Sequence, residues 1–184
     1  EGIIVAIGQT NENPRYIIVD DGNDRIYIDI TYYESWTFDG ENISLNLYDE
    51  VRIIARRGYL DPTFFIPKLF TPRVIQVLSS DNVITNLPTQ ITIDETLEFD
   101  YTDVNIYYQY VTISGTLINK SSAFVIQSES TLFNYTNAIG PNKYLVVGNV
   151  LDEATITDLE NLEGQTIEIT GYLIGFTSQN SYGT

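Results

Sequence analysis

The residues best placed to do chemistry form a basic and aromatic cluster between positions 52 and 73. Five of the nine basic residues of the chain fall in this interval, interleaved with aromatic rings. Cations that follow a phosphate backbone, next to rings that stack on bases, are what single-stranded nucleic-acid binding requires. The residues expected to form such a site are Arg56, Arg57, Tyr59, Phe64 and Lys68. Alternatively, the rings complete a hydrophobic core and the arginines pair with the abundant carboxylates.

Catalytic chemistry is restricted by the absence of His and Cys from the chain. Thiol nucleophiles, Ser-His-Asp triads and zinc sites made of His or Cys are therefore excluded. Carboxylates are plentiful, since 25 of the 184 residues are acidic, but no dense group of them has recognisable metal-site spacing. The sequence predicts a protein that is not an enzyme and has no metal or cofactor. A glycosidase with a carboxylate acid and base is the enzymatic alternative.

Two further segments carry residues with possible binding roles. The run Asp20-Asp21-Gly22-Asn23-Asp24 contains oxygen-bearing side chains that could coordinate calcium, but it lacks the spacing of an EF-hand loop. Its Asp-Gly pair between apolar runs predicts an ordinary hairpin turn within residues 15–30. The aromatic residues Tyr32, Tyr33, Trp36 and Phe38 either plug the bottom of a barrel or bind a sugar or a partner.

The net charge of -16 is unevenly distributed. Residues 1–80 hold 12 acidic and 7 basic residues, whereas residues 81–184 hold 13 acidic and 2 basic residues. Non-specific nucleic-acid binding depends on Lys and Arg neutralising phosphates, so the second half is a poor candidate for it. No apolar run approaches the roughly 20 residues that span a bilayer, and no signal peptide is visible.

These residues lie on a strand pattern that occurs twice along the chain. The first copy consists of Gly2-Ile3-Ile4-Val5, Tyr16-Ile17-Ile18-Val19-Asp20, Arg25-Ile26-Tyr27-Ile28-Asp29-Ile30 and Asp49-Glu50-Val51-Arg52-Ile53-Ile54-Ala55. The second consists of Gly115-Thr116-Leu117-Ile118, Phe124-Val125-Ile126-Gln127 and Gly164-Gln165-Thr166-Ile167-Glu168-Ile169-Thr170-Gly171. The repeat predicts two small β domains, at residues 1–80 and 107–184, joined by a linker at 81–106.

This strand order resembles the OB-fold, and within it the OB-type modules of bacterial secreted nucleases and surface lipoproteins. Their sequences run as Gly-x-Val, aromatic-x-Ile-x-Asp and then Gly-Asp-x-Val-x-Ile-x-Gly. The resemblance implies an all-β fold class of two tandem OB-like, five-stranded Greek-key barrels. The first copy departs from the pattern at Tyr48 and Ala55, where glycines are expected.

The two ends of the repeat are unequal. The first strand of domain one is expected to be cut short upstream, because in the second copy residues 110–114 precede the matching glycine. The second copy has no counterpart of the strand at 73–78, so the second barrel either lacks its last strand or closes differently. A short helix is predicted at 152–163, with Thr157 or Asp158 as its cap and Gly164 at its end.

The expected function is a non-catalytic tandem OB-fold interaction or spacer module of a larger exported bacterial protein, located outside the cell or on its surface. Its partner would be an unknown protein or the adjoining domains of the parent chain. One alternative is a weak single-stranded nucleic-acid-binding accessory module of a secreted nuclease, centred on the Arg52–Arg73 interval. Another is a carbohydrate-binding module that uses exposed aromatic residues.

Overall fold

The computed structural model describes the backbone of residues 1–10, 13–30, 44–60, 67–93, 95, 103–119, 124–127, 144–147 and 153–174. Within these ranges the protein is all-β apart from a short α-helix and short helical turns. The first unit comprises β1 (Gly2–Thr10), β2 (Asn13–Asp20), β3 (Arg25–Asp29), β4 (Glu50–Leu60) and β5 (Pro67–Ser79). The second comprises β6 (Thr89–Ile91), the 3-10 turn Val104–Ile106, β7 (Tyr110–Asn119), β8 (Phe124–Gln127), β9 (Tyr144–Val147), α2 (Glu153–Asn161) and β10 (Thr166–Tyr172).

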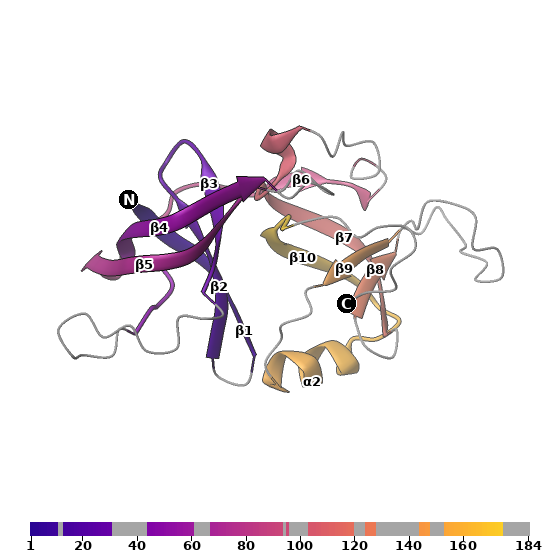
Figure 1. Ribbon diagram of the computed structural model, residues 1–184. Coiled ribbons are helices and arrows are strands. Elements are labelled where there is room, and N and C mark those ends of the chain that lie inside the picture. Colours follow the sequence, from indigo (N-terminus) through magenta and orange to yellow (C-terminus); the bar gives the residue numbers. More distant parts are fainter. Residues whose placement is uncertain are drawn as a thin grey trace.

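The first unit is a closed barrel with the strand order β1-β2-β3-β5-β4 (Figure 1). Its β3 and β5 run parallel, whereas the other neighbouring strands are antiparallel. Alternate residues of the strands point inward, as the period of two requires. They form a core of Ile4, Ile17, Val19, Ile28, Ile30, Val51 and Ile75. Every strand predicted in residues 1–80 overlaps one of these five strands.

The second unit is a sheet of order β10-β7-β8-β9, to which β6 adds by pairing in parallel with β7. This order matches β4-β1-β2-β3 of the first unit. The predicted helix is present as α2, but its predicted cap is wrong. Thr157 lies inside the helix, where its hydroxyl donates to the Glu153 carbonyl at 2.9 Å. Gly164, with a φ of 80°, follows the helix and turns the chain toward β10.

The leading glycines of the two copies occupy corresponding positions. Gly2 pairs with Val51 on β4, and Gly115 pairs with Ile167 on β10. A Cβ on Gly2 would lie 2.5 Å from the carbonyl oxygen of Asp20, and a Cβ on Gly115 would meet the Ile126 side chain at 2.3 Å. In both units, therefore, neighbouring atoms fill the space beside this glycine and leave no room for a side chain.

Residues 81–106, expected as a linker, contribute to the second unit. Thr89–Ile91 forms β6, and Ile93 is buried in a cluster with Val111, Ile113 and Ile126. Among the described helices, none is long and apolar enough to cross a membrane.

The run from Asp20 to Asp24 forms a hairpin turn, as predicted. The Asp21 carboxylate accepts hydrogen bonds from the backbone amides of Asn23 and Asp24, both at 2.9 Å, and these bonds lower its pKa. Gly22 takes a φ of 94°. In the described part of the chain, no group of three or more acidic residues is arranged to hold a metal ion.

Candidate functional site

The two units share a hydrophobic core on the outside of the barrel. Ile18 lies between two inward-pointing residues of β2 and therefore faces outward, yet it is fully buried. With Val5 it packs against Ile106, Tyr107 and Tyr108, which immediately precede β7. The second unit thus covers the outer face of β1 and β2 (Figure 1).

Aromatic rings extend this contact across the barrel surface. Tyr16 lies over Gly8, where a Cβ would meet the ring, and it stacks on Tyr27 with ring centres 4.7 Å apart. Tyr27 in turn stacks on Tyr108 at 6.4 Å, and the Lys68 ammonium lies 5.1 Å from the centre of the Tyr27 ring. Burial raises the pKa of the Tyr27 and Tyr108 phenols far above the usual value, so both remain neutral.

A polar contact fixes the same interface. The Arg25 Nε donates to the Asp20 carboxylate at 2.7 Å, and its Nη1 donates to the Tyr108 carbonyl at 3.3 Å. The guanidinium also lies 5.6 Å from the centre of the Tyr172 ring. Asn86 donates to the same Asp20 carboxylate at 3.4 Å. The Arg25 guanidinium of the first unit therefore contacts both the Tyr108 carbonyl and the Tyr172 ring of the second unit.

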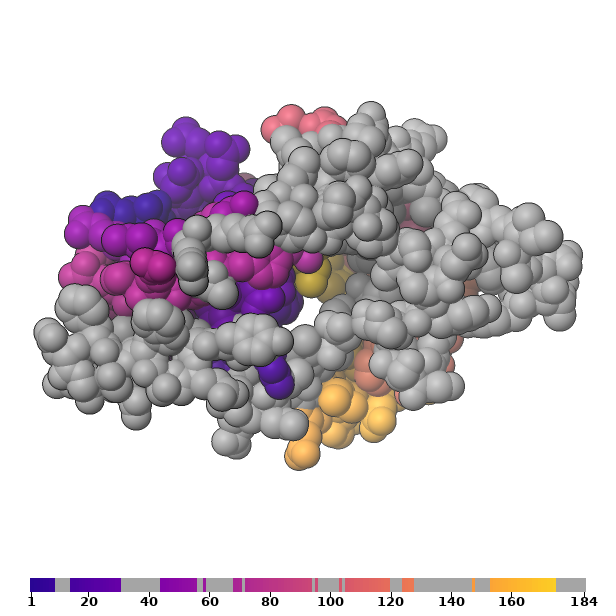
Figure 2. All heavy atoms as spheres, in the orientation of Figure 1, coloured from indigo at the N-terminus to yellow at the C-terminus, as the bar shows by residue number. Residues whose placement is uncertain are grey.

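Beside this interface the two units enclose a cleft of about 850 Å³. Figure 2 shows it as a hollow between the barrel and β10. Its described lining consists of Val5, Ala6, Ile7, Tyr16, Ile18, Leu47, Tyr48, Asn82, Val83, Ile84, Asn86, Tyr110, Thr170, Gly171, Tyr172, Leu173 and Ile174. None of these side chains is charged. Tyrosines and amides supply most of the polar groups that face the space.

One wall of the cleft carries Tyr48, in the turn before β4. Its φ is 69°, and its amide donates to the Ile4 carbonyl at 2.8 Å. In the second unit, Gly164 has a φ of 80° and donates to the Leu117 carbonyl at 2.8 Å. The glycine absent from the first copy is thus replaced by a tyrosine in the same left-handed conformation.

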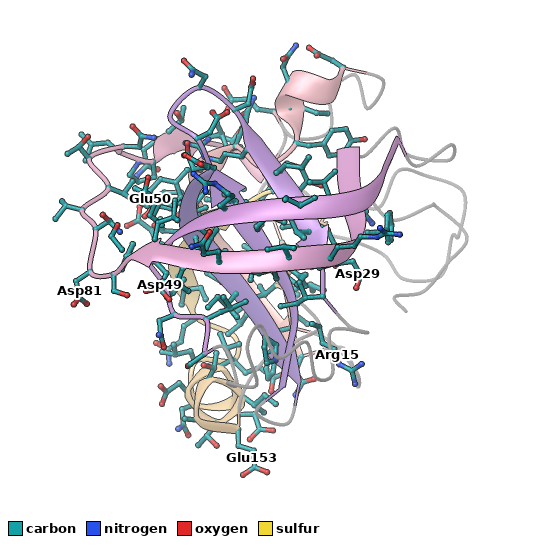
Figure 3. All side chains as sticks on the ribbon, turned by 60° about the vertical axis from the view of Figure 1, so that its left-hand side comes forward. Arg15, Asp29, Asp49, Glu50, Asp81 and Glu153 are labelled. Atoms are coloured by element: carbon teal, nitrogen blue, oxygen red, sulfur yellow. The ribbon has the colours of Figure 1, made fainter. Side chains whose placement is uncertain are left out.

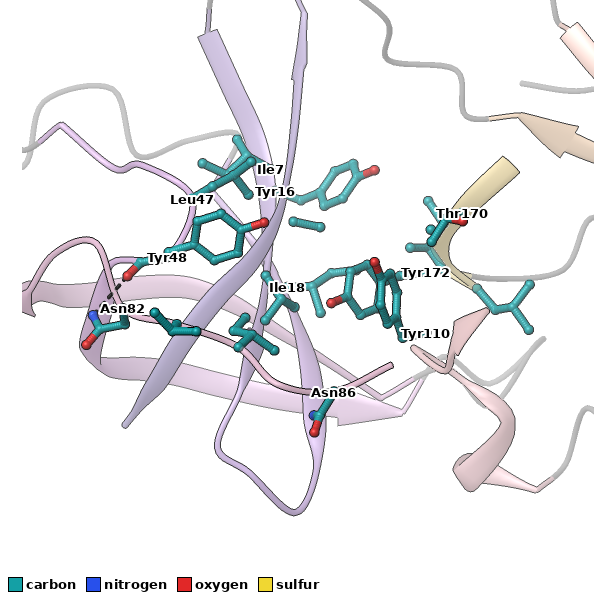
Figure 4. A pocket seen from close by; sticks show the side chains of 17 residues that line it. Ile7, Tyr16, Ile18, Leu47, Tyr48, Asn82, Asn86, Tyr110, Thr170 and Tyr172 are labelled. Atoms are coloured by element: carbon teal, nitrogen blue, oxygen red, sulfur yellow. Dashed lines mark hydrogen bonds between the residues drawn. The ribbon is translucent and has the colours of Figure 1, made fainter. Parts of the chain in front are cut away.

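Neighbouring polar groups hold this turn in place. The Asn82 side chain donates to the Tyr48 carbonyl at 2.9 Å (Figure 4), and the buried Asp49 carboxylate accepts from the Asn46 amide at 2.9 Å. Figure 3 shows Asp49 with the acidic residues Glu50 and Asp81 at this end of the barrel. The turn is therefore fixed on both sides, although the Tyr48 side chain is 46% exposed.

The opposite wall is formed by Tyr110, at the start of β7, and Tyr172, at the end of β10. Their rings stack with centres 4.9 Å apart, and the residues pair across the two strands. Burial is the main cause that raises the pKa of Tyr172 to about 12, and Tyr48 is one of the nearby groups that raise it further. Figure 4 shows Tyr48 and this pair on opposite sides of the cleft.

The basic cluster expected from the sequence lies elsewhere, on β4 and β5. The strand register places Tyr59 opposite Lys68 and Arg57 opposite Phe70. Arg56 is also on β4, but the side chains of Arg56, Arg57 and Tyr59 lie outside the described part, as does all of Phe64. The role of these residues stays a prediction.

Sequence reasoning missed the cleft, although it noted Tyr48 as a departure from the repeat. One signal for the interface was available. The unbroken apolar run Tyr16–Val19 has no polar residue on either face, and such runs are typical of strands covered on both faces.

Comparison with protein-family models, with curated proteins and with solved structures finds no match to this chain.

Proposed function

We propose that the protein is a non-catalytic interaction module made of two OB-like units held in a fixed relative position, within a larger exported bacterial protein. The repeat of strand order between β4-β1-β2-β3 and β10-β7-β8-β9 supports the tandem assignment. So does the position of α2, between the strands equivalent to the third and fourth of the barrel. The expected partner is another protein or an adjoining domain of the same chain.

The observation that carries this proposal is the shared core. In OB-folds that bind oligonucleotides or oligosaccharides, the face of the second and third strands is the usual binding surface. In this barrel the corresponding outer face carries Ile18 and Tyr27, which pack against Tyr107 and Tyr108. This surface of the first unit is therefore occupied by the second unit. Such a fixed arrangement is suitable for a rigid spacer or for a binding surface formed by both units.

The fixed arrangement is tested by Ile18→Asn, which places a polar group in the shared core and leaves the barrel interior unchanged. Small-angle X-ray scattering should show a larger radius of gyration, and thermal unfolding should separate into two transitions. Ile54→Asn is the matched control, because Ile54 is 54% exposed on β4. An unchanged scattering profile for Ile18→Asn would show that the units are not held by this core.

The absence of catalysis is tested directly. Single-stranded DNA, RNA and neutral oligosaccharides incubated with the protein, with Mg²⁺ or Ca²⁺ and without either, should remain intact. The chain has no His or Cys to supply a nucleophile or base, so any hydrolysis would have to use carboxylates, hydroxyls, Lys or Arg. A product that disappears on substitution of a specific Asp pair would disprove the non-catalytic assignment.

Weak binding of single-stranded nucleic acid is a second candidate function. It is favoured by the β4–β5 register, which brings the backbones of Arg57, Tyr59 and Lys68 within one short stretch of paired strands. The excess of acidic over basic residues in 1–80 repels the phosphate backbone, so the expected affinity for nucleic acid is low.

A further inference from the structure

We propose that the cleft between the two units binds a neutral oligosaccharide, with Tyr48 as a residue that stacks on a sugar ring. The inference rests on the proposed two-unit module, because both units form the walls of the site. It is carried by three observations: the backbone strain at Tyr48, the aromatic pair that faces it, and the uncharged lining between them.

The conformation of Tyr48 is costly and is not explained by packing. A left-handed φ disfavours any residue with a Cβ, and the second unit meets the same requirement with Gly164. Tyr108, also left-handed at 62°, gains full burial in the shared core. Tyr48 gains much less, because almost half of its side chain is exposed. Strain retained at an exposed residue is a feature of ligand sites.

The facing wall supplies a second aromatic surface. Tyr110 and Tyr172 stack on each other, and Arg25 lies over the Tyr172 ring, so this pair is held in place. Burial raises the pKa of Tyr172 to about 12, so this phenol stays protonated even in moderately alkaline solution. It can then donate a hydrogen bond as well as accept one. Rings on both walls suit a flat ligand that enters between them.

The lining selects against anionic ligands. Its described side chains are aliphatic, phenolic, hydroxyl or amide groups, and the whole chain carries a net charge of -16. Two cations near the shared core are already engaged, Arg25 with Asp20 and Lys68 with Tyr27. A nucleic acid would find no free described cation in the cleft to neutralise its phosphates.

A neutral sugar matches the polar groups of this lining. Its apolar ring face can stack on tyrosine. The Asn82, Asn86 and Thr170 side chains already take part in hydrogen bonds within the protein, but amides and hydroxyls retain further donor or acceptor positions to which sugar hydroxyls can bond. The cleft volume of about 850 Å³ is within the range of about 300–1,000 Å³ usual for small-ligand sites. A short oligosaccharide is therefore the occupant to which both the chemistry and the size correspond.

The test uses isothermal titration calorimetry of the full chain with cellotetraose and maltotetraose as neutral probes. Tetragalacturonate serves as an acidic probe and decaproline as a peptide probe. At least one neutral tetrasaccharide should bind, and both other probes should bind at least tenfold more weakly. Preferred binding of decaproline or of the acidic sugar, or no binding of either neutral sugar, would overturn the inference.

Variants separate recognition from folding. Tyr48→Gly should reduce the affinity at least tenfold while the melting temperature stays the same or rises, and Tyr48→Phe should keep most of the affinity. Leu87→Ala is the control, because Leu87 is 87% exposed and is not among the described residues that line the cleft. Unchanged affinity in Tyr48→Gly would show that the ring is not the stacking group.

The outcomes also distinguish this inference from the proposed function. If neither sugar binds and Ile18→Asn still separates the units, the site inference fails and the two-unit module stands. If a sugar binds and is cleaved, the non-catalytic function fails and the site stands.

Discussion

The turn before β4 and the turn before β10 have the same backbone arrangement but different residues. In each, the residue at the turn has a positive φ and its backbone amide donates to the carbonyl of a fully buried residue, Ile4 on β1 or Leu117 on β7. The second unit uses Gly164, whereas the first uses Tyr48. The comparison separates what the fold requires, which is a left-handed residue, from what the first unit adds, which is an exposed ring.

The largest expected effect concerns the two left-handed tyrosines themselves. Tyr108→Ala should lower the free energy of unfolding by about 3–5 kcal/mol, the usual cost of removing a large aromatic side chain from a core. Tyr48→Ala should have a much smaller effect, because its ring is half exposed. Urea denaturation followed by circular dichroism measures both. Equal losses would contradict the distinction between a packing role and a binding role.

The next effect compares two glycines of the second unit. Gly115→Ala should destabilise the protein by about 1–3 kcal/mol, because its Cβ would approach the Gln127 carbonyl oxygen to 2.6 Å and the core cannot easily expand. Gly171→Ala should change stability by less than about 0.5 kcal/mol, because nothing lies within 4 Å of its Cβ position and the first copy has Ala55 there. Chemical denaturation of both variants provides the check, and a harmless Gly115→Ala would refute the close-approach explanation.

A smaller change in stability is expected when the left-handed residue of each turn is substituted. Gly164→Ala should cost about 1–2 kcal/mol from backbone strain alone, since no atom lies within 4 Å of its Cβ position. Tyr48→Gly should release strain of similar size, partly offset by the greater freedom of glycine in the unfolded chain and by lost ring contacts, for a net gain of up to ~1 kcal/mol. Melting temperatures of the two single variants should therefore shift in opposite directions. A clear loss of stability in Tyr48→Gly would mean that the ring is retained for packing.

The smallest effect concerns nucleic acid on β4 and β5. If about three phosphates are neutralised, the logarithm of the affinity for single-stranded DNA should fall with the logarithm of salt concentration with a slope of roughly -2. Arg56→Ala combined with Arg57→Ala should abolish this binding, whereas Tyr48→Gly should leave it unchanged. Fluorescence anisotropy at low salt is the measurement. Binding that survives the double substitution would place the nucleic-acid site on another surface.

The individual strands could be predicted from the sequence because their alternation and their turn residues are local signals. The hairpin around Gly22 and the strand that contains Gly115 are examples. The predicted helix was also correct, but its cap was not. Thr157 instead bonds back to the carbonyl of Glu153, one turn earlier. Cap residues of similar type compete over a few positions, so the sequence alone did not fix the first turn.

The cleft could not be predicted because it depends on contacts between distant segments. Tyr107 and Tyr108 follow a segment that was expected to be a linker, and nothing local shows that they pack on Ile18. The left-handed φ of Tyr48 also contradicts the intrinsic preference of tyrosine. The only indication in the sequence was that Tyr48 occupies a position of the repeat where a glycine is expected. What the sequence lacked was the relative placement of the two units.

The outward-facing position of Ile18 has a consequence for synthesis of the chain. The barrel strands end at Ser79, but the buried residues of the second unit that pack with Ile18 begin at Ile106. At the usual elongation rates of about 5–20 residues per second, the two segments leave the ribosome roughly one to five seconds apart. During that interval a completed barrel would expose Val5 and Ile18 to solvent as a hydrophobic patch. A nascent chain halted between these points should therefore attract chaperones that a chain halted beyond Tyr108 does not.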